Sequence, residues 1–206
     1  MSKALEEARK MEAAAIALRK ELEAKEKENA IQLCTAERGQ RIIGNAGHEY
    51  IVLKQMPSEG QTMIVSTDFM AENAVFDQDT TNYAESNLKA RIEETILPVI
   101  EADFGADNIV EHEVDLTTVD MQRDFGACKC KVRTLTFDEG REFNDLLVKE
   151  ELPDLYWTCT PWSTEKRGWK YSIAVVPRVR INRCNINYGV RPFCILKSNI
   201  FVSKGE

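Results

Sequence analysis

Apolar residues in the first thirty positions recur at alternating spacings of four and three. They form a narrow seam, and charged residues fill most of the other positions. The pattern predicts one helix over residues 2–30 with a heptad seam, as in a coiled coil. We assign residues 1–33 to oligomerisation or docking. The alternative is a helix folded back on its own domain, but a narrow, Ala-rich seam better suits a partner helix. The seam comprises Ala8, Met11, Ala15, Leu18 and Leu22.

The pattern then changes to strand-like alternation. After a predicted linker over 34–47, which is rich in glycine, residues 48–53 and 62–66 alternate apolar and polar positions around a Pro-Ser-Glu-Gly turn. This is typical of a β-hairpin. Residues 169–175 and 179–183 alternate in the same way, which predicts further short antiparallel strands near the C-terminus.

Two helices are predicted between these strand regions. Asn82–Glu85 resembles a capping box for a helix that runs to about Leu97 and is interrupted by Pro98. Thr136–Glu139 is a second capping box, which follows a short strand and begins a helix ending near Leu152. The order of elements predicts an α+β domain over 48–206, with helices packed around a small, twisted antiparallel sheet.

Composition limits where the protein can function and what it can bind. The 206 residues are 43% hydrophobic and 30% charged, and no apolar run approaches the length of about 20 that spans a bilayer. The N-terminus lacks the apolar centre of a secretory signal, so we expect synthesis in the cytoplasm and no membrane insertion. The net charge is −7, yet the chain from Cys159 onward holds nine Lys and Arg against two Glu. We expect an acidic partner or a neighbouring subunit, and no nucleic acid.

The six cysteines and two histidines give little material for catalysis. The setting favours reduced thiols, and Cys128-Lys-Cys130 is too tight for the usual zinc spacing. His48 is interpreted as a polar residue at a strand edge, because no second His or Cys lies nearby. Phosphate loops, nucleophile elbows and zinc-protease motifs are absent. We therefore expect no metal, no cofactor and no enzymatic activity.

Five stretches carry a family resemblance. They are His48–Leu53, Asn82-Tyr-Ala-Glu-Ser-Asn-Leu-Lys89, Leu135-Thr-Phe-Asp-Glu139, Tyr156-Trp-Thr-Cys-Thr-Pro161 and Gly189-Val-Arg-Pro192. In this order they resemble an uncharacterised domain family of gut bacteria, prophages and phages. That family is distantly similar to the C-type lectin-like fold of formylglycine-generating enzymes and of the variable receptor-binding proteins of diversity-generating retroelements. The resemblance covers residues 45–197.

The resemblance implies a C-type lectin-like fold and two groups of residues. The structural group is Trp157, Pro161, Gly189, Arg191 and Pro192: Trp157 is expected in the core, Gly189 in a turn, and Arg191 as a tie to loop carbonyls or a carboxylate. The segment 162–188 corresponds to the variable surface of the receptor-binding relatives. Half of its residues, including Trp169 and Tyr171, could instead be core. The predicted binding surface comprises Trp162, Arg167, Arg178, Arg180, Asn182, Arg183, Asn185, Asn187 and Tyr188.

The sequence departs from the sugar-binding and catalytic relatives. The calcium-binding tripeptides are absent, and Cys184 and Cys194 are ten residues apart, unlike the close copper-binding pair of formylglycine-generating enzymes. We therefore expect a non-enzymatic virion protein: a head fibre, a decoration protein, or a tail or baseplate component. It would form dimers or trimers through its N-terminal helix and bind other virion proteins, with a host-surface protein or glycan as a further ligand. The alternatives are a cytoplasmic enzyme or modifying factor on the formylglycine-generating scaffold, and a bacterial ligand-binding module with a packed helix.

Overall fold

The computed structural model describes residues 10–12, 14–20, 29–148, 152, 155–164, 171–176 and 178–205, with the backbone alone for 171–176 and 178–180. The fold is α+β and mainly antiparallel, as the sequence predicts. Residues 10–12 and 14–20 are helical. Among the described residues, no helix combines the length and apolar character needed to cross a membrane.

The larger sheet has seven strands in the order β1-β14-β2-β3-β4-β13-β8. Its centre is the predicted hairpin, β3 and β4, which pairs through β4 with β13 near the C-terminus. The sheet is therefore more extensive than the small one predicted. Its strands are β1 (Ala30–Gln32), β2 (Arg41–Ile43), β3 (Glu49–Met56), β4 (Gln61–Ser66), β8 (Val132–Thr134), β13 (Pro192–Lys197) and β14 (Phe201–Lys204).

The second sheet has five strands in the order β11-β10-β9-β12-β5, and β12 runs parallel to β9. It contains the predicted C-terminal strands, and its members are β5 (Ala71–Val75), β9 (Tyr156–Pro161), β10 (Tyr171–Val176), β11 (Arg178–Arg183) and β12 (Asn187–Val190). A separate two-stranded ribbon pairs β6 (His112–Asp115) with β7 (Ala127–Cys130).

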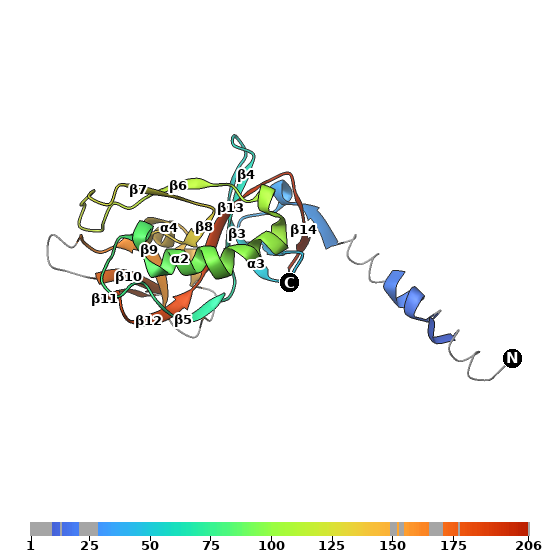
Figure 1. Ribbon diagram of the computed structural model, residues 1–206. Helices are drawn as coiled ribbons and strands as arrows, with labels where there is room; N and C mark the ends of the chain where they lie inside the picture. The colour runs from blue at the N-terminus through green and yellow to red at the C-terminus, as the bar shows by residue number, and fades with distance from the viewer. Residues whose placement is uncertain are drawn as a thin grey trace.

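The first helical region differs from the prediction at both ends. Asn82 caps only a single 3₁₀ turn, η2 (Tyr83–Glu85), and Ser86 caps the helix proper by accepting the Lys89 N–H. The run α2 (Asn87–Arg91), π-helical η3 (Ile92–Ile96) and α3 (Leu97–Phe104) then continues past Pro98. A proline near the start of α3 is tolerated because the preceding π turn already changes the hydrogen-bond pattern. In Figure 1 this run passes across the front of the molecule, from the side of β9 and β10 toward β14.

The second helical region begins as predicted. Thr136 accepts the Glu139 N–H while the Glu139 side chain accepts the Thr136 N–H, which completes the capping box of α4 (Phe137–Glu142). A break at Phe143 separates α4 from α5 (Asn144–Leu147). Short 3₁₀ turns also occur at η1 (Leu33–Thr35) and η4 (Ala106–Asn108).

The segment predicted as a linker belongs to the folded domain. Strand β2 lies inside residues 34–47, and β1 begins at Ala30 and pairs with β14. Leu33, Ala36 and Ile42 are buried in the same hydrophobic cluster as Trp157. Three of the fourteen residues of this segment are glycines, yet the apolar side chains between them reach the core.

Candidate functional site

Trp157 of β9 belongs to the larger of the two buried hydrophobic clusters. Its side chain is fully buried, and its indole N–H donates to the Ala74 carbonyl at 2.7 Å. The ring contacts Phe76 and Tyr188 edge to face, with centroid distances of 5.8 and 5.0 Å. This bond and these contacts join β9, β5 and β12, so Trp157 fixes the five-stranded sheet against the core.

Arg191 and Gly189 lie beside the same strands. The Arg191 side chain is fully buried, donates from Nε to the Ser66 carbonyl at 2.7 Å, and lies with Cζ 5.6 Å from the Tyr156 ring centroid. Gly189 does not occupy the expected turn: it lies within β12 and its φ is not positive. A Cβ at Gly189 would lie 2.5 Å from the Phe69 ring, so glycine is required by close packing.

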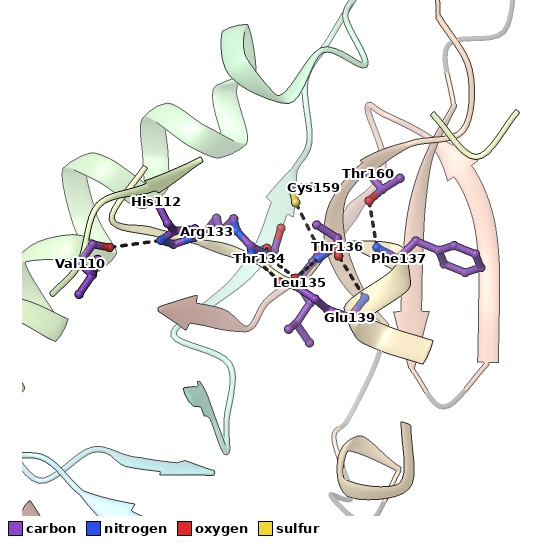
Figure 2. Close-up of polar contacts among 10 residues, drawn as sticks. All are labelled: Val110, His112, Arg133, Thr134, Leu135, Thr136, Phe137, Glu139, Cys159 and Thr160. Carbon is purple, nitrogen blue, oxygen red and sulfur yellow. Dashed lines mark hydrogen bonds and ion pairs between the residues drawn. The ribbon is translucent and has the colours of Figure 1, made fainter. Parts of the chain in front are cut away.

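Figure 2 shows a network of polar contacts centred on the buried Arg133 of β8. Its guanidinium binds both carboxylate oxygens of Glu139 at 2.6 Å and stacks 4.2 Å from the Phe193 ring centroid. Its Nε donates to Nε2 of His112 at 2.9 Å, while the His112 Nδ1–H donates to the Val110 carbonyl at 3.2 Å. These contacts join β6, β8, β13 and α4.

The groups in this network determine one another's protonation states. Burial alone raises the pKa of the Glu139 carboxyl, but the ion pair with Arg133 outweighs it and leaves that pKa below its ordinary value. Burial and the neighbouring Arg133 cation lower the pKa of His112 from 6.5 to about 4. His112 is therefore neutral near pH 7, with Nε2 as an acceptor, so it stabilises the fold and is poorly suited to acid–base catalysis.

The residues of the predicted binding surface have different environments. Arg183, Asn185 and Asn187 are exposed around the turn between β11 and β12, and Asn182 is half-buried at the end of β11. Tyr188 is half-buried against Trp157. The structure describes Arg178 and Arg180 only as backbone positions of β11, and Arg167 and Trp169 lie outside the described residues.

Trp162 and this turn are linked indirectly, because the turn and the residue after Trp162 both bond to the segment 77–81. The Asp77 N–H donates to the Cys184 carbonyl at 3.0 Å, and the Thr81 hydroxyl donates to the Ser163 carbonyl at 3.1 Å. Trp162 is half-buried, and its carbonyl accepts the Asp120 N–H at 3.3 Å. The turn residues and Trp162 therefore flank one segment.

The cysteines are free thiols, and five of them are buried: Cys128, Cys130, Cys159, Cys184 and Cys194. Burial raises the pKa of Cys130 to about 11 and that of Cys159 to about 12, which disfavours the nucleophilic thiolate. Cys184 follows β11 of the smaller sheet and Cys194 lies in β13 of the larger one. Within the described residues, no three His, Cys, Asp or Glu side chains gather as a metal site.

His48 has a partner that sequence reasoning missed. Its Nδ1 lies 2.9 Å from the carboxylate of Asp103, a fully buried residue of α3 that also accepts the Tyr50 hydroxyl at 2.6 Å. The two residues are 55 positions apart, so no local pattern joins them. Gly44 was the one available signal: a Cβ there would lie 2.4 Å from Asp103, although nothing in the sequence says what the glycine makes room for.

Part of the predicted N-terminal seam lies within the described helix. Met11 and Leu18 are 75% and 59% exposed, and Ala15 is also exposed. Ala8 and Leu22 lie outside the described residues. The described part of the seam is therefore accessible to a partner.

Comparison with protein-family models, with curated proteins and with solved structures found no match.

Proposed function

We propose that the chain is a non-enzymatic structural protein of a phage or prophage particle. Its N-terminal helix joins copies of the chain to one another or to neighbouring particle proteins. Its α+β domain, which we propose to be C-type lectin-like, presents a surface for a protein or glycan. This combination of an assembly helix and a binding domain fits a head fibre, a decoration protein, or a tail or baseplate component.

The exposed seam is the observation that carries the proposal. Met11, Ala15 and Leu18 lie at spacings of four and three, which places them on one face of a helix. Each is exposed, with Met11 at 75%. Apolar side chains spaced in heptads gain free energy when a second helix covers them, and a short helix of this kind is marginal alone.

The distribution of polar groups in the domain supports a role in binding a partner. Trp157 and Arg191 are buried and fix the framework, whereas Arg183 and Asn185 are exposed on a turn between strands. Arginine and asparagine supply strong and adaptable hydrogen bonds at interfaces. The excess of Lys and Arg from Cys159 onward favours an acidic partner surface.

The assembly role is tested by two matched variants and multi-angle light scattering. Leu18→Lys places a charge in the seam, and Ile16→Lys places the same charge at an exposed position outside it, where Ile16 is 52% exposed. We expect the unmodified chain to be a dimer or trimer, Leu18→Lys to be a folded monomer, and Ile16→Lys to keep the native mass. A monomeric unmodified chain, or equal behaviour of the two variants, would contradict the proposal.

A further inference from the structure

A cavity of about 390 Å³ lies between the start of β3, the loop after β4 and helix α3. Polar residues on its wall include His48, Glu49, Ser66, Thr67 and Asp68. Its volume falls within the range of roughly 300–1,000 Å³ that is usual for small-molecule sites. Its chemistry is unusual because the polar side chains are arranged mainly as hydrogen-bond acceptors.

His48 is held in one orientation by buried groups. The Asp103 carboxylate accepts from His48 Nδ1 at 2.9 Å, from the Tyr50 hydroxyl at 2.6 Å and from the Ala46 N–H at 2.8 Å. With Nδ1 bonded to this carboxylate, Nε2 is the ring nitrogen left for a further hydrogen bond. His48 is about half exposed, and within the described residues its Nε2 has no hydrogen-bond partner. Because His48 lines the cavity, this nitrogen can accept a hydrogen bond there when the imidazole is neutral.

The two hydroxyl groups on the cavity wall already donate hydrogen bonds within the protein, so a ligand can meet them only as acceptors. Ser66 donates to the Asp68 carbonyl at 2.7 Å, and Thr67 donates to the Glu49 carbonyl at 3.1 Å. Glu49 is paired with Arg41, whereas the exposed carboxylate of Asp68 has no ion pair with any other described residue. Asp68 thus supplies an uncompensated negative charge at the cavity.

The loop that carries Asp68 is held in place by contacts with residues 189–191. Arg191 Nε donates to the Ser66 carbonyl at 2.7 Å, and the Met70 N–H donates to the Val190 carbonyl at 3.0 Å. The Phe69 ring fits where Gly189 has no side chain. These contacts hold Asp68 and Phe69 in place before any ligand arrives, which lowers the entropic cost of binding.

We propose that this cavity binds an organic cation, a primary ammonium or guanidinium group on an apolar stem. Such a group donates several hydrogen bonds and accepts none, which matches His48 Nε2 and the Asp68 carboxylate. Phe69, Met70 and Val99 line the remaining wall and suit the stem, with the aromatic ring also attracting the charge. The site lies apart from the N-terminal seam, so this proposal does not depend on the assembly role.

The same chemistry occurs in free amines and in protein side chains, and the test separates the two sources. Agmatine and cadaverine are the free probes, and acetyl-lysine methylamide and acetyl-arginine methylamide represent a side chain of a partner protein. Pentane-1,5-diol is the neutral control. Binding is measured on the full-length chain by amide chemical shifts of residues 66–70 at constant ionic strength.

We expect saturable shifts with dissociation constants on the order of 1–10 mM and none with the diol. Asp68→Asn should weaken binding roughly three- to tenfold, the range expected when one accessible ion pair is lost. The matched variant Asp107→Asn removes an exposed carboxylate outside the cavity and should change nothing. Val99→Arg should abolish binding, because its own guanidinium can occupy the cavity.

Tighter binding of the capped amino acids supports a protein partner as the source, and tighter binding of the free amines supports a metabolite. Absence of saturation for all four cations up to about 50 mM would overturn the proposal, because that is weaker than any specific site of this size. Equal affinity for the chain and for folded Asp68→Asn would also overturn it.

Discussion

At the scale of single residues, Gly189 owes its role to a neighbour 120 positions away. The Phe69 ring occupies the space in which any larger residue would place its Cβ, at 2.5 Å. Gly140 in α4 is the opposite case, because a Cβ there would meet no atom within 4 Å. The two glycines, one in a strand and one in a helix, thus differ in the atoms that a Cβ would meet.

We expect Gly189→Ala to destabilise the domain by about 1–3 kcal/mol, since Phe69 or β12 must move to relieve the overlap. Gly140→Ala should be neutral or stabilising by up to about 1 kcal/mol, because alanine favours a helix interior. Urea unfolding followed by tryptophan fluorescence measures both free energies. Equal effects of the two changes would contradict the packing argument.

The polar residues show how far sequence reasoning reaches. The Thr136–Glu139 capping box is local, with all its atoms within one helical turn, and it was predicted correctly. The pairs His48–Asp103 and Arg133–His112 join residues 55 and 21 positions apart, and each depends on how separate strands and helices pack. No periodicity encodes such pairs. Every residue of β9 is buried, so no local alternation marks Trp157 as a core residue, and its burial was expected from the family resemblance.

At the scale of elements, α4 and the ribbon strand β6 are both linked to β8 through Arg133. A buried cation of this kind stays in place only while its partners keep complementary states. Glu139 must remain ionised and His112 must remain neutral. The attachment of these elements is therefore sensitive to acid.

The sign of the pH effect follows from His112, whose pKa falls from 6.5 to about 4 on folding. Between these values the unfolded chain binds a proton that the folded chain does not, so the free energy of unfolding falls as pH falls through this window. The whole difference corresponds to about 3.4 kcal/mol, of which about 2–3 kcal/mol is lost between pH 6.5 and pH 4. Glu139, whose pKa is lowered in the fold, adds a loss of stability at still lower pH.

His112→Gln tests this link, because glutamine can accept from Arg133 but does not titrate. We expect the variant to lose about 2–3 kcal/mol less than the unmodified chain between pH 6.5 and 4, as measured by urea unfolding at several pH values. Parallel pH profiles for the two proteins would show that His112 is not the titrating group.

The elements also explain two errors of sequence reasoning. Pro98 stops a regular α-helix, but the π turn of η3 directly before it lets the helical run continue to Phe104. The glycine-rich stretch 34–47 was taken as a linker, yet β2 pairs with β3 and β14 inside the larger sheet. Strand pairing overrode the local signal at 34–47, whereas a local change of helix type accommodates Pro98.

At the scale of the whole molecule, the two sheets and the helical run contribute to a shared core. A single buried cluster contains Ile42 of β2, Ile92 of η3 and Trp157 of β9. The described part of the seam is exposed, and so are the polar residues of the β11–β12 turn. The buried core and these two accessible surfaces are therefore separate parts of the molecule.

The most direct test of the account is the protein content of phage or prophage particles released by lysis of the strain that encodes the chain. Quantitative mass spectrometry of density-purified particles should find the chain as a multi-copy component, and deletion of residues 1–28 should remove it from the particles while leaving it folded in the lysate. A full-length chain that stays entirely in the soluble fraction, with particles complete without it, would contradict the account.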